Sequence, residues 1–253
     1  MSPGQRAVLD DALLRARLAA YPVGEFVGQE SFLCATEILS LADRAGIAAG
    51  VSVLDLCCGV AGPGRLIAGR LGCGYLGVDV SDEAIALARE RAAPGCAFEV
   101  ARIPPVPAGP FDVVLLLETM LAFADKESLL EAVAAALAPG GRFAFTVEEG
   151  AALTASERAG MPEADTVWPV PLPELLSTLE RVGLRVRWRD DWTASHAARA
   201  TSLLRAFRAH EPEIRAALGA TAFDDLVVAH RRWSQWLCAR RVRKLAFVTD
   251  RVG

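Results

Sequence analysis

Lysine is nearly absent from this sequence of 253 residues: it occurs only at Lys126 and Lys244, and arginine carries the rest of the positive charge. The formal net charge is −4, so the composition gives no reason to expect a polyanionic partner. The single basic run, 240–244, is most simply a surface segment that stays in contact with water. We therefore expect no nucleic-acid partner.

Long apolar runs are also missing. No stretch approaches the roughly 20 apolar residues that a membrane-spanning helix needs. The N-terminal segment MSPGQRAVLDDALLRARLAA carries charged residues throughout, unlike a secretory leader with its apolar centre. We therefore expect a cytoplasmic protein with no membrane attachment.

Cysteine is present, but not in a pattern typical of metal sites. The six cysteines include no CxxC pair and stand at no zinc-like spacing to histidine. Cys57 and Cys58 are adjacent, so their side chains diverge and would chelate one ion poorly. We expect small reduced thiols and no bound metal.

Internal repeats are absent, and segments typical of strands and helices alternate instead. This order predicts an α/β fold, a doubly wound and mostly parallel sheet covered on both faces. With 53% hydrophobic residues, one domain with a sizeable core is expected. Alternation of apolar residues with arginine over 184–189 places that strand near an edge. Strands are predicted at 51–56, 75–80, 96–100, 111–117, 142–147, 184–189 and 245–249, and helices at 63–71, after Ser81, at 126–137 after Asp125, and at 172–182 before Gly183.

Two segments fall outside this alternation. Residues 1–46 form an N-terminal helical arm, and residues 193–238 contain two or three helices that could form a lid over the carboxyl edge of the sheet. We treat both as parts of a single domain. Its core is then 47–192, and residues 239–253 supply the final strand.

The stretch VLDLCCGVAGPG (53–64) is a buried strand followed by a turn of small residues. In an open α/β sheet, ligands bind beyond the carboxyl ends of the strands, where small residues let a ligand approach the backbone. Asp79 ends the next predicted strand, and a carboxylate there can accept hydrogen bonds from both ribose hydroxyls. A nucleoside ligand is therefore expected. The alternative is that Asp79 only caps the next helix, although Ser81 is better placed to do so.

The pattern D-x-C-x-G-x-A-G-P-G from Asp55 resembles the first motif of class I S-adenosylmethionine-dependent methyltransferases, usually D-x-G-x-G-x-G. LGVDVSDEAIALAR (76–89), FDVVLLLETM (111–120) and LAPGGRFAFT (137–146) resemble later motifs of that family. The resemblance is nearest to the branch with sarcosine, sterol and natural-product methyltransferases. It implies a Rossmann-like sheet of seven strands with an antiparallel last strand, and S-adenosylmethionine as cofactor. The cofactor contacts implied are Asp55, Cys57, Gly59, Ala61, Gly62, Asp79 and Val80.

Two departures from the family pattern bear on the cofactor. Cys57 and Ala61 replace the outer glycines, which the turn tolerates if their φ angles stay negative. The third motif lacks its usual aspartate, so adenine is held by a backbone carbonyl, by Ile103, or by stacking on Arg102. The sequence leaves these three possibilities open.

Two ionisable residues are candidates for catalysis at the strand ends. Glu118 follows an apolar strand, so burial could raise its pKa and make it a useful base. Alternatively, Glu118 binds the cofactor's amino group or a backbone N–H of the arm. His196 is a candidate proton acceptor or else a surface residue at a helix start. Glu148 and Glu149 end the fifth strand.

Aromatic residues in the second half of the chain predict an apolar or aromatic acceptor pocket around the lid. The arm segment AYPVGEFVGQESF (20–32) could close over the cofactor as a flap, with Tyr21 and Gln29 near its methionine end. His230 shares a helical face with apolar residues, so it is either a core histidine or part of the pocket. The candidate acceptor contacts are Thr119, Met120, Trp168, Trp192, His230 and Trp233.

These features together predict a methyltransferase for a small organic acceptor, in secondary (natural-product) metabolism. One alternative is an NAD(P)-dependent oxidoreductase on a related sheet. Another is a protein of this fold that binds the cofactor without transferring methyl. The accepting atom (carbon, nitrogen or oxygen) and the oligomeric state are left open by the sequence.

Overall fold

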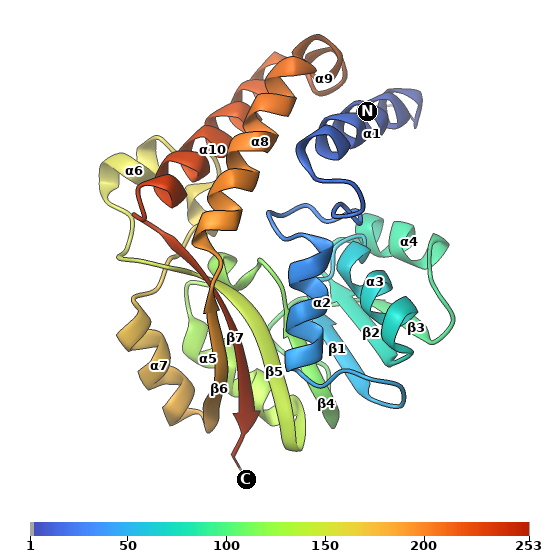
Figure 1. Cartoon of the computed structure of the whole chain (residues 1–253), viewed down its shortest axis with the longest axis vertical. Helices are drawn as coiled ribbons and strands as arrows, with labels where there is room; N and C mark the ends of the chain where they lie inside the picture. Colours follow the sequence, from blue (N-terminus) through green and yellow to red (C-terminus); the bar gives the residue numbers. More distant parts are fainter. Residues whose placement is uncertain (1–2, 253) are drawn as a thin grey trace.

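A seven-stranded sheet runs through the computed structural model, which describes residues 3–252 and only the backbone of residues 3–10 (Figure 1). In chain order the strands are β1 (Ser52–Leu56), β2 (Gly74–Asp79), β3 (Cys96–Val100), β4 (Phe111–Leu116), β5 (Leu137–Glu149), β6 (Leu184–Asp191) and β7 (Arg243–Arg251). Their order across the sheet is β3-β2-β1-β4-β5-β7-β6. β7 is antiparallel to β5 and β6, and the strands β1 to β5 pair in parallel. The predicted fold class is confirmed.

Alternate residues of the central strands enter two separate cores. In β4, Val113 and Leu115 pack with helices α2 (Ala35–Arg44), α3 (Gly62–Leu71) and α4 (Asp82–Glu90). Val114 and Leu116 pack on the other face with α5 (Lys126–Ala136) and α7 (Leu172–Arg181). Because both faces are covered, the strand reads as a continuous apolar run, and ligands can reach the sheet only at its ends.

The helix starts follow from local capping. Ser81 Oγ accepts a hydrogen bond from the amide of Ala84 at 3.1 Å, and Asp125 Oδ1 accepts one from the amide of Ser128 at 3.0 Å. Each of these bonds satisfies an amide that has no partner within its own helix. The caps predicted at Ser81 and Asp125 are confirmed.

Two strand predictions need correction. β5 begins at Leu137 rather than at residue 142, so the turn expected over 138–141 lies inside the strand, where pairing with β4 shifts between Phe111 and Val113. β6 is an edge strand, as predicted, but its alternation is broken by a register shift between Val186 and Trp188. The irregularity turns Val186 outward, where it is 37% exposed.

Four further helices stand beyond the carboxyl ends of the parallel strands: α1 (Pro3–Ala20), α8 (Thr193–Ala209), α9 (Glu211–Leu218) and α10 (Ala220–Cys238) (Figure 1). They share a small core of their own, in which Ala16 and Tyr21 pack with Leu203, Phe207 and Phe223. We call these four helices the cap. A short helix, α6 (Ala155–Ala159), lies beside α10.

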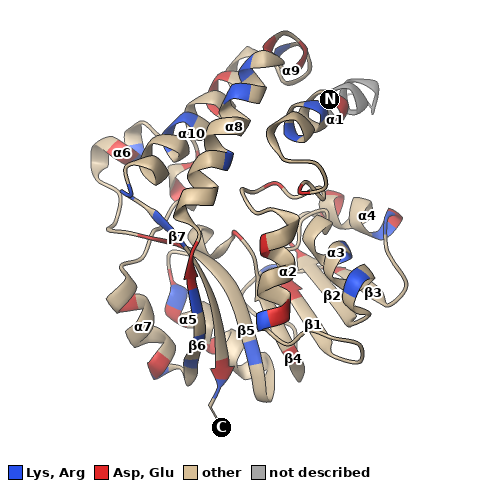
Figure 2. Cartoon of the chain, in the orientation of Figure 1, with Lys and Arg blue, Asp and Glu red and all other residues tan. Residues whose placement is uncertain are grey.

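Charged residues of both signs are interspersed over the sheet and the helices (Figure 2). This distribution agrees with the small net charge of −4. Within the part of the chain that the structure describes, no helix has both the length and the apolar character that crossing a membrane would require.

Candidate active site at the carboxyl ends of the strands

The turn between β1 and α3 has a left-handed backbone at three positions. The φ angles are +58° at Cys57, +54° at Gly59 and +57° at Ala61. Cys57 and Ala61 therefore do not keep the negative φ angles that were expected of them from the sequence. Left-handed φ costs a residue with a Cβ about 1–2 kcal/mol. The turn thus keeps a glycine-like conformation although glycine has been replaced, which is a strain typical of functional turns.

A cavity of about 220 Å³ opens beside this turn, lined by Asp55, Cys57, Gly59 and Gly62 among others. A Cβ at Gly59 would meet nothing within 4 Å, so a ligand has room to approach the backbone there. At Gly62, by contrast, a Cβ would lie 2.5 Å from the carbonyl oxygen of Val27, because the arm packs against the turn. Ala61, predicted to contact the cofactor, is fully buried in the core instead.

Asp79 connects the first two strand ends. Its Oδ2 accepts a hydrogen bond from the amide of Gly59 at 2.8 Å, and its Oδ1 accepts one from the amide of Ser81 at 2.9 Å. Ser81 is the residue that caps α4, so Asp79 is not merely a helix cap. Its carboxylate connects the turn after β1 to the turn after β2. A carboxylate has about four acceptor positions, so two are left for a ligand. Its role as the ribose ligand stays a prediction.

Like Asp79, the predicted cofactor contacts Val80, Arg102 and Ile103 do not line the 220 Å³ cavity. Val80 is 57% exposed, Arg102 is exposed, and Ile103 packs against the core on the α5 side of the sheet. The predicted contacts of these residues with adenine or ribose stay untested predictions.

The carboxylate of Asp55 is buried under the same turn. It accepts a hydrogen bond of 2.5 Å from the hydroxyl of Tyr75. Burial raises the pKa of Asp55 from 3.8 to about 7, although the Tyr75 bond opposes the shift. The sequence did not single out Tyr75, whose ring also fills the space that a side chain at position 64 would need.

Glu118 lies at the end of β4 with a left-handed φ of +64°. Its Oε2 accepts a hydrogen bond from the amide of Phe32 at 3.4 Å, so it binds the arm backbone, one of the alternatives considered. Burial raises its pKa, but Lys244 and His196 outweigh burial and lower the pKa below the ordinary value. The prediction of a base with a raised pKa is therefore wrong for Glu118, because the sequence did not reveal that Lys244 and His196 lie beside it.

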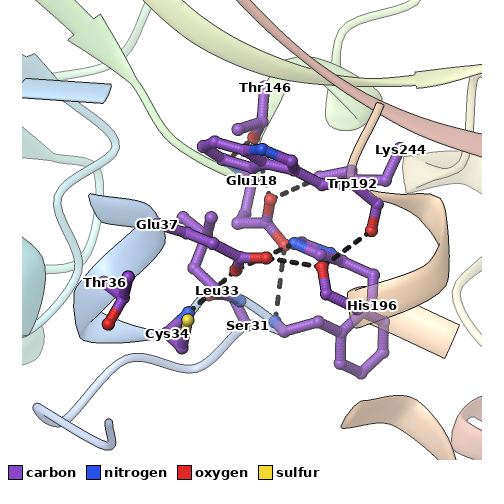
Figure 3. A network of polar contacts seen from close by, with 12 residues as sticks. Ser31, Leu33, Cys34, Thr36, Glu37, Glu118, Thr146, Trp192, His196 and Lys244 are labelled. Carbon is purple, nitrogen blue, oxygen red and sulfur yellow. Dashed lines mark hydrogen bonds and ion pairs between the residues drawn. The ribbon is translucent and has the colours of Figure 1, made fainter. Parts of the chain in front are cut away.

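His196 is fully buried in the first turn of α8, so the alternative of a surface residue is wrong. Its Nε2 lies 3.4 Å from a carboxylate oxygen of Glu37, and its Nδ1 lies 3.8 Å from Glu118 (Figure 3). Glu37 also accepts a hydrogen bond from the hydroxyl of Ser195 at 2.5 Å. These contacts join α2, α8 and the end of β4, and Glu37 was missed because its position in an ordinary amphipathic helix gave no signal.

Lys244 was predicted to lie in a surface segment, 240–244, and this prediction is wrong for Lys244. It is 1% exposed, and its Nζ lies 2.5 Å from an oxygen of Glu118 and 2.5 Å from an oxygen of Glu148. The only signal was a lone lysine next to an apolar strand in a lysine-poor chain. Buried ammonium and carboxylate groups persist only when they are paired, so these three groups form one unit.

A second cavity, of about 300 Å³, lies between the arm, the strand ends and the cap. It meets the first cavity at Gln29, Glu30, Ser31 and Glu118, which line both. Besides Gln29 and Glu118, the second cavity is lined by three predicted contacts, Tyr21, His230 and Trp233, together with Leu121, Leu203, Phe207 and Ala229. Burial lowers the pKa of His230, and its Nδ1 lies 2.9 Å from the carbonyl oxygen of Leu226.

Gln29 lines both cavities, but its amide is already engaged by the arm. Its Oε1 accepts from the amide of Val27 at 2.6 Å, and its Nε2 donates to the carbonyls of Glu25 at 3.1 Å and Leu33 at 2.7 Å. The side chain thus fixes the loop 25–33 over the strand ends.

The remaining predicted acceptor contacts are scattered. Thr119 lines the first cavity. Met120 is fully buried in the core and Trp192 is nearly buried against the ring of His196, with 6.4 Å between the ring centres. Trp168 lies beside α5 and α7, where the guanidinium of Arg158 stacks 4.1 Å from its ring centre. The structure therefore does not bring Trp168, Trp192 and Met120 into the proposed pocket.

Comparisons with known proteins agree with this geometry. Residues 53–141 match a family model described as a methyltransferase domain. Methyltransferase GfsG from Streptomyces halstedii is 31% identical over 112 residues, which cover 42% of this chain and 40% of that protein. The match thus spans less than half of the length of this curated relative.

Solved structures resemble the whole chain. The cyclopropane synthase MmaA2 from Mycobacterium tuberculosis superimposes with a TM-score of 0.78 at 15% identity, covering 99% of both chains. Phosphoethanolamine N-methyltransferase 2 from Haemonchus contortus, solved with S-adenosyl-L-methionine, gives a TM-score of 0.77 at 19% identity, covering 96% of this chain and 57% of that one.

Residues 53–141 thus match a methyltransferase domain, and the chain shares its fold with the solved methyltransferase from Haemonchus contortus. Helices α1, α8 and α10 of the cap supply residues to the walls of the second cavity.

Proposed function

We propose that the protein is an S-adenosylmethionine-dependent methyltransferase that acts on a small organic acceptor. The observation that carries this proposal is the meeting of two cavities at Glu118, one beside the β1–α3 turn and one under the cap. A methyl donor in the first and an acceptor in the second would face each other at this junction. Holding two reactants in line supplies most of what methyl transfer requires.

The residues of the first cavity fit the cofactor. Gly59 leaves its backbone open, and Asp79 keeps two acceptor positions at the neighbouring strand end for ribose hydroxyls. The ionised carboxylate of Glu118 suits the positively charged methionine end. When bound, S-adenosylmethionine supplies a methyl group on a positively charged sulfur. His196 lies behind Glu118 against Glu37, a place that suits a group that positions Glu118.

The second cavity suits an acceptor with an apolar or aromatic body. Leu121, Leu203, Phe207 and Trp233 are among its walls, and α1, α8 and α10 contribute residues to it. We propose that segments 1–46 and 193–238 act as arm and lid, which exclude water during the transfer. A small product of secondary metabolism is the acceptor class that the family resemblance favours.

Calorimetric titration with S-adenosylhomocysteine and, separately, with NADH tests the proposal. We expect saturable binding of S-adenosylhomocysteine and none of NADH. Binding of NADH alone would instead support the oxidoreductase alternative. Transfer of a labelled methyl group to any small acceptor would exclude the alternative in which the protein binds the cofactor without transferring methyl.

A further inference from the structure

One side-chain oxygen of Glu148, a residue that lines the second cavity, is buried without a hydrogen-bond partner among the described residues. Its Oε1 accepts a hydrogen bond of 2.5 Å from Lys244, whereas Oε2 has no hydrogen-bond partner among the described residues. The residue is only 7% exposed, and it lines the 300 Å³ cavity together with Glu118. Buried polar atoms are nearly always paired, so an unpaired carboxylate oxygen on a residue that lines a cavity points to a ligand that donates a hydrogen bond.

The side chains that line the cavity indicate which chemical class of ligand it would accept. The cavity that Glu148 lines has aromatic and aliphatic walls, including Leu121, Phe207 and Trp233, together with the charged side chains of Arg17 and Glu30. A ligand that fits both features has an apolar or aromatic body and one donor group. A hydroxyl is such a donor, and it becomes a strong methyl acceptor only when a base takes its proton. A neutral amine attacks without a base, and an ammonium group has no free electron pair.

We propose that Glu148 binds the hydroxyl group of the acceptor and takes its proton as the methyl group is transferred to oxygen. This inference rests on the proposed methyltransferase function and adds its acceptor class. The acceptor O–H bond breaks and its proton goes to Oε2 of Glu148. The acceptor oxygen bonds to the methyl carbon while the sulfur–methyl bond breaks and its electron pair stays on sulfur. The products are a methyl ether, S-adenosylhomocysteine and a protonated Glu148, which returns its proton to water.

The surroundings of Glu148 suit this role. Burial raises the pKa of Glu148, and the charge of Glu118 raises it further, whereas Lys244 opposes the shift. A raised pKa makes the carboxylate a better proton acceptor than an ordinary glutamate. The charged or titratable groups on the elements packed around it are Glu118 after β4, Lys244 on β7, His196 on α8, Lys126 on α5, Arg17, Tyr21 and Glu30 in the arm, and His230 on α10.

The test uses the full-length protein saturated with S-adenosylhomocysteine and two matched probes, 2-naphthol and 2-methoxynaphthalene. We expect 2-naphthol to bind at least about tenfold tighter, since only it can donate to Oε2. Glu148→Leu should abolish this preference. Glu149→Gln is the matched control, because Glu149 is the next residue of β5 and pairs with Arg243 at 2.7 Å outside the cavity. Tm values of all variants check folding.

Kinetics give a second readout. With labelled S-adenosylmethionine and 2-naphthol, the wild-type rate should rise with pH as Glu148 loses its proton and then level off. Glu148→Gln, which keeps an acceptor for Lys244, should lower kcat roughly 100-fold or more and remove that rise. A hydroxyl preference that survives Glu148→Leu, or failure of 2-naphthol to bind while S-adenosylhomocysteine still binds, would overturn the inference alone. Failure of S-adenosylhomocysteine to bind would overturn the proposed function itself.

Discussion

The ammonium group of Lys244 lies 2.5 Å from the carboxylate of Glu118, where the start of β7 meets the end of β4. The same ammonium binds Glu148, so one buried cation serves two carboxylates that line the second cavity. Glu118 in turn contacts the arm through Phe32 and the cap through His196. The polar unit therefore connects the sheet to both accessory segments.

Removing the cation should be costly. Lys244→Met leaves two buried carboxylates uncompensated, and we expect the free energy of unfolding to fall by about 3–5 kcal/mol. The preceding residue offers the control, because Arg243 pairs with Glu149 between the same two strands but is partly exposed. Arg243→Met should change stability by at most about 1 kcal/mol. Urea unfolding of both variants measures the difference, and equal losses would show that the pairing of Lys244 is unimportant.

The left-handed turn leads to a prediction for Ala61. Replacing a buried alanine by glycine in a helix destabilises by about 1 kcal/mol, and we expect that loss for Ala68→Gly in α3. Ala61 instead has a φ of +57° at the N-cap of α3. Ala61→Gly should therefore be neutral or stabilising by up to about 1 kcal/mol, with cofactor binding kept. Thermal unfolding compares the two variants. A loss of stability in Ala61→Gly as large as in Ala68→Gly would contradict the inference that the backbone at Ala61 is strained.

Asp79 should contribute to cofactor affinity. Asp79→Ala removes the carboxylate that accepts a hydrogen bond from the amide of Gly59 and would accept hydrogen bonds from the ribose hydroxyls. S-adenosylhomocysteine should therefore bind about 1–3 kcal/mol more weakly. Asp82→Ala, in the first turn of α4, is the control and should leave affinity unchanged. Unchanged affinity in a folded Asp79→Ala variant would remove Asp79 from the site.

Asp55 should make stability depend on pH. Its pKa is raised from 3.8 to about 7 in the folded protein, so the folded state holds a proton that the unfolded chain releases. Stability is therefore lost as pH rises from about 4 to 7, by at most about 4 kcal/mol. Asp55→Asn keeps an acceptor for Tyr75 but cannot ionise, so its stability relative to the wild type should increase over this range.

The control for Asp55 is Asp112. Hydrogen bonds from the amide and hydroxyl of Ser52 lower the pKa of Asp112. The contribution of Asp112 to stability is therefore fully present at every pH above the pKa of an ordinary carboxyl group. The stability difference between wild type and Asp112→Asn should stay constant between about pH 5 and 7. Urea unfolding at several pH values gives both curves, and a flat curve for Asp55→Asn would contradict the raised pKa.

Local features of the sequence predicted the sheet well. Strand periodicity and the caps at Ser81 and Asp125 depend on residues close in sequence, and the structure shows them nearly as expected. Phe111–Leu116 reads as a buried strand because both of its faces are covered. The start of β5 was misplaced because Gly140 and Gly141 are tolerated within the strand next to a register shift.

The polar unit at the site could not be predicted in the same way. Glu118, Glu148, His196 and Lys244 come from four elements, and only the packing of the cap on the strand ends brings them together. The pKa of Glu118 therefore had the wrong predicted direction, since the sequence showed its apolar strand but not that Lys244 and His196 lie beside it. The sign of φ at Cys57 likewise depends on the surrounding turn.

A crystal structure of the complex with S-adenosylhomocysteine tests the central claim most directly. We predict that its ribose lies next to Asp79, and that its sulfur lies where the two cavities meet at Glu118. A complex with the ligand bound elsewhere, or with the 220 Å³ cavity filled by side chains of the protein, would contradict the account.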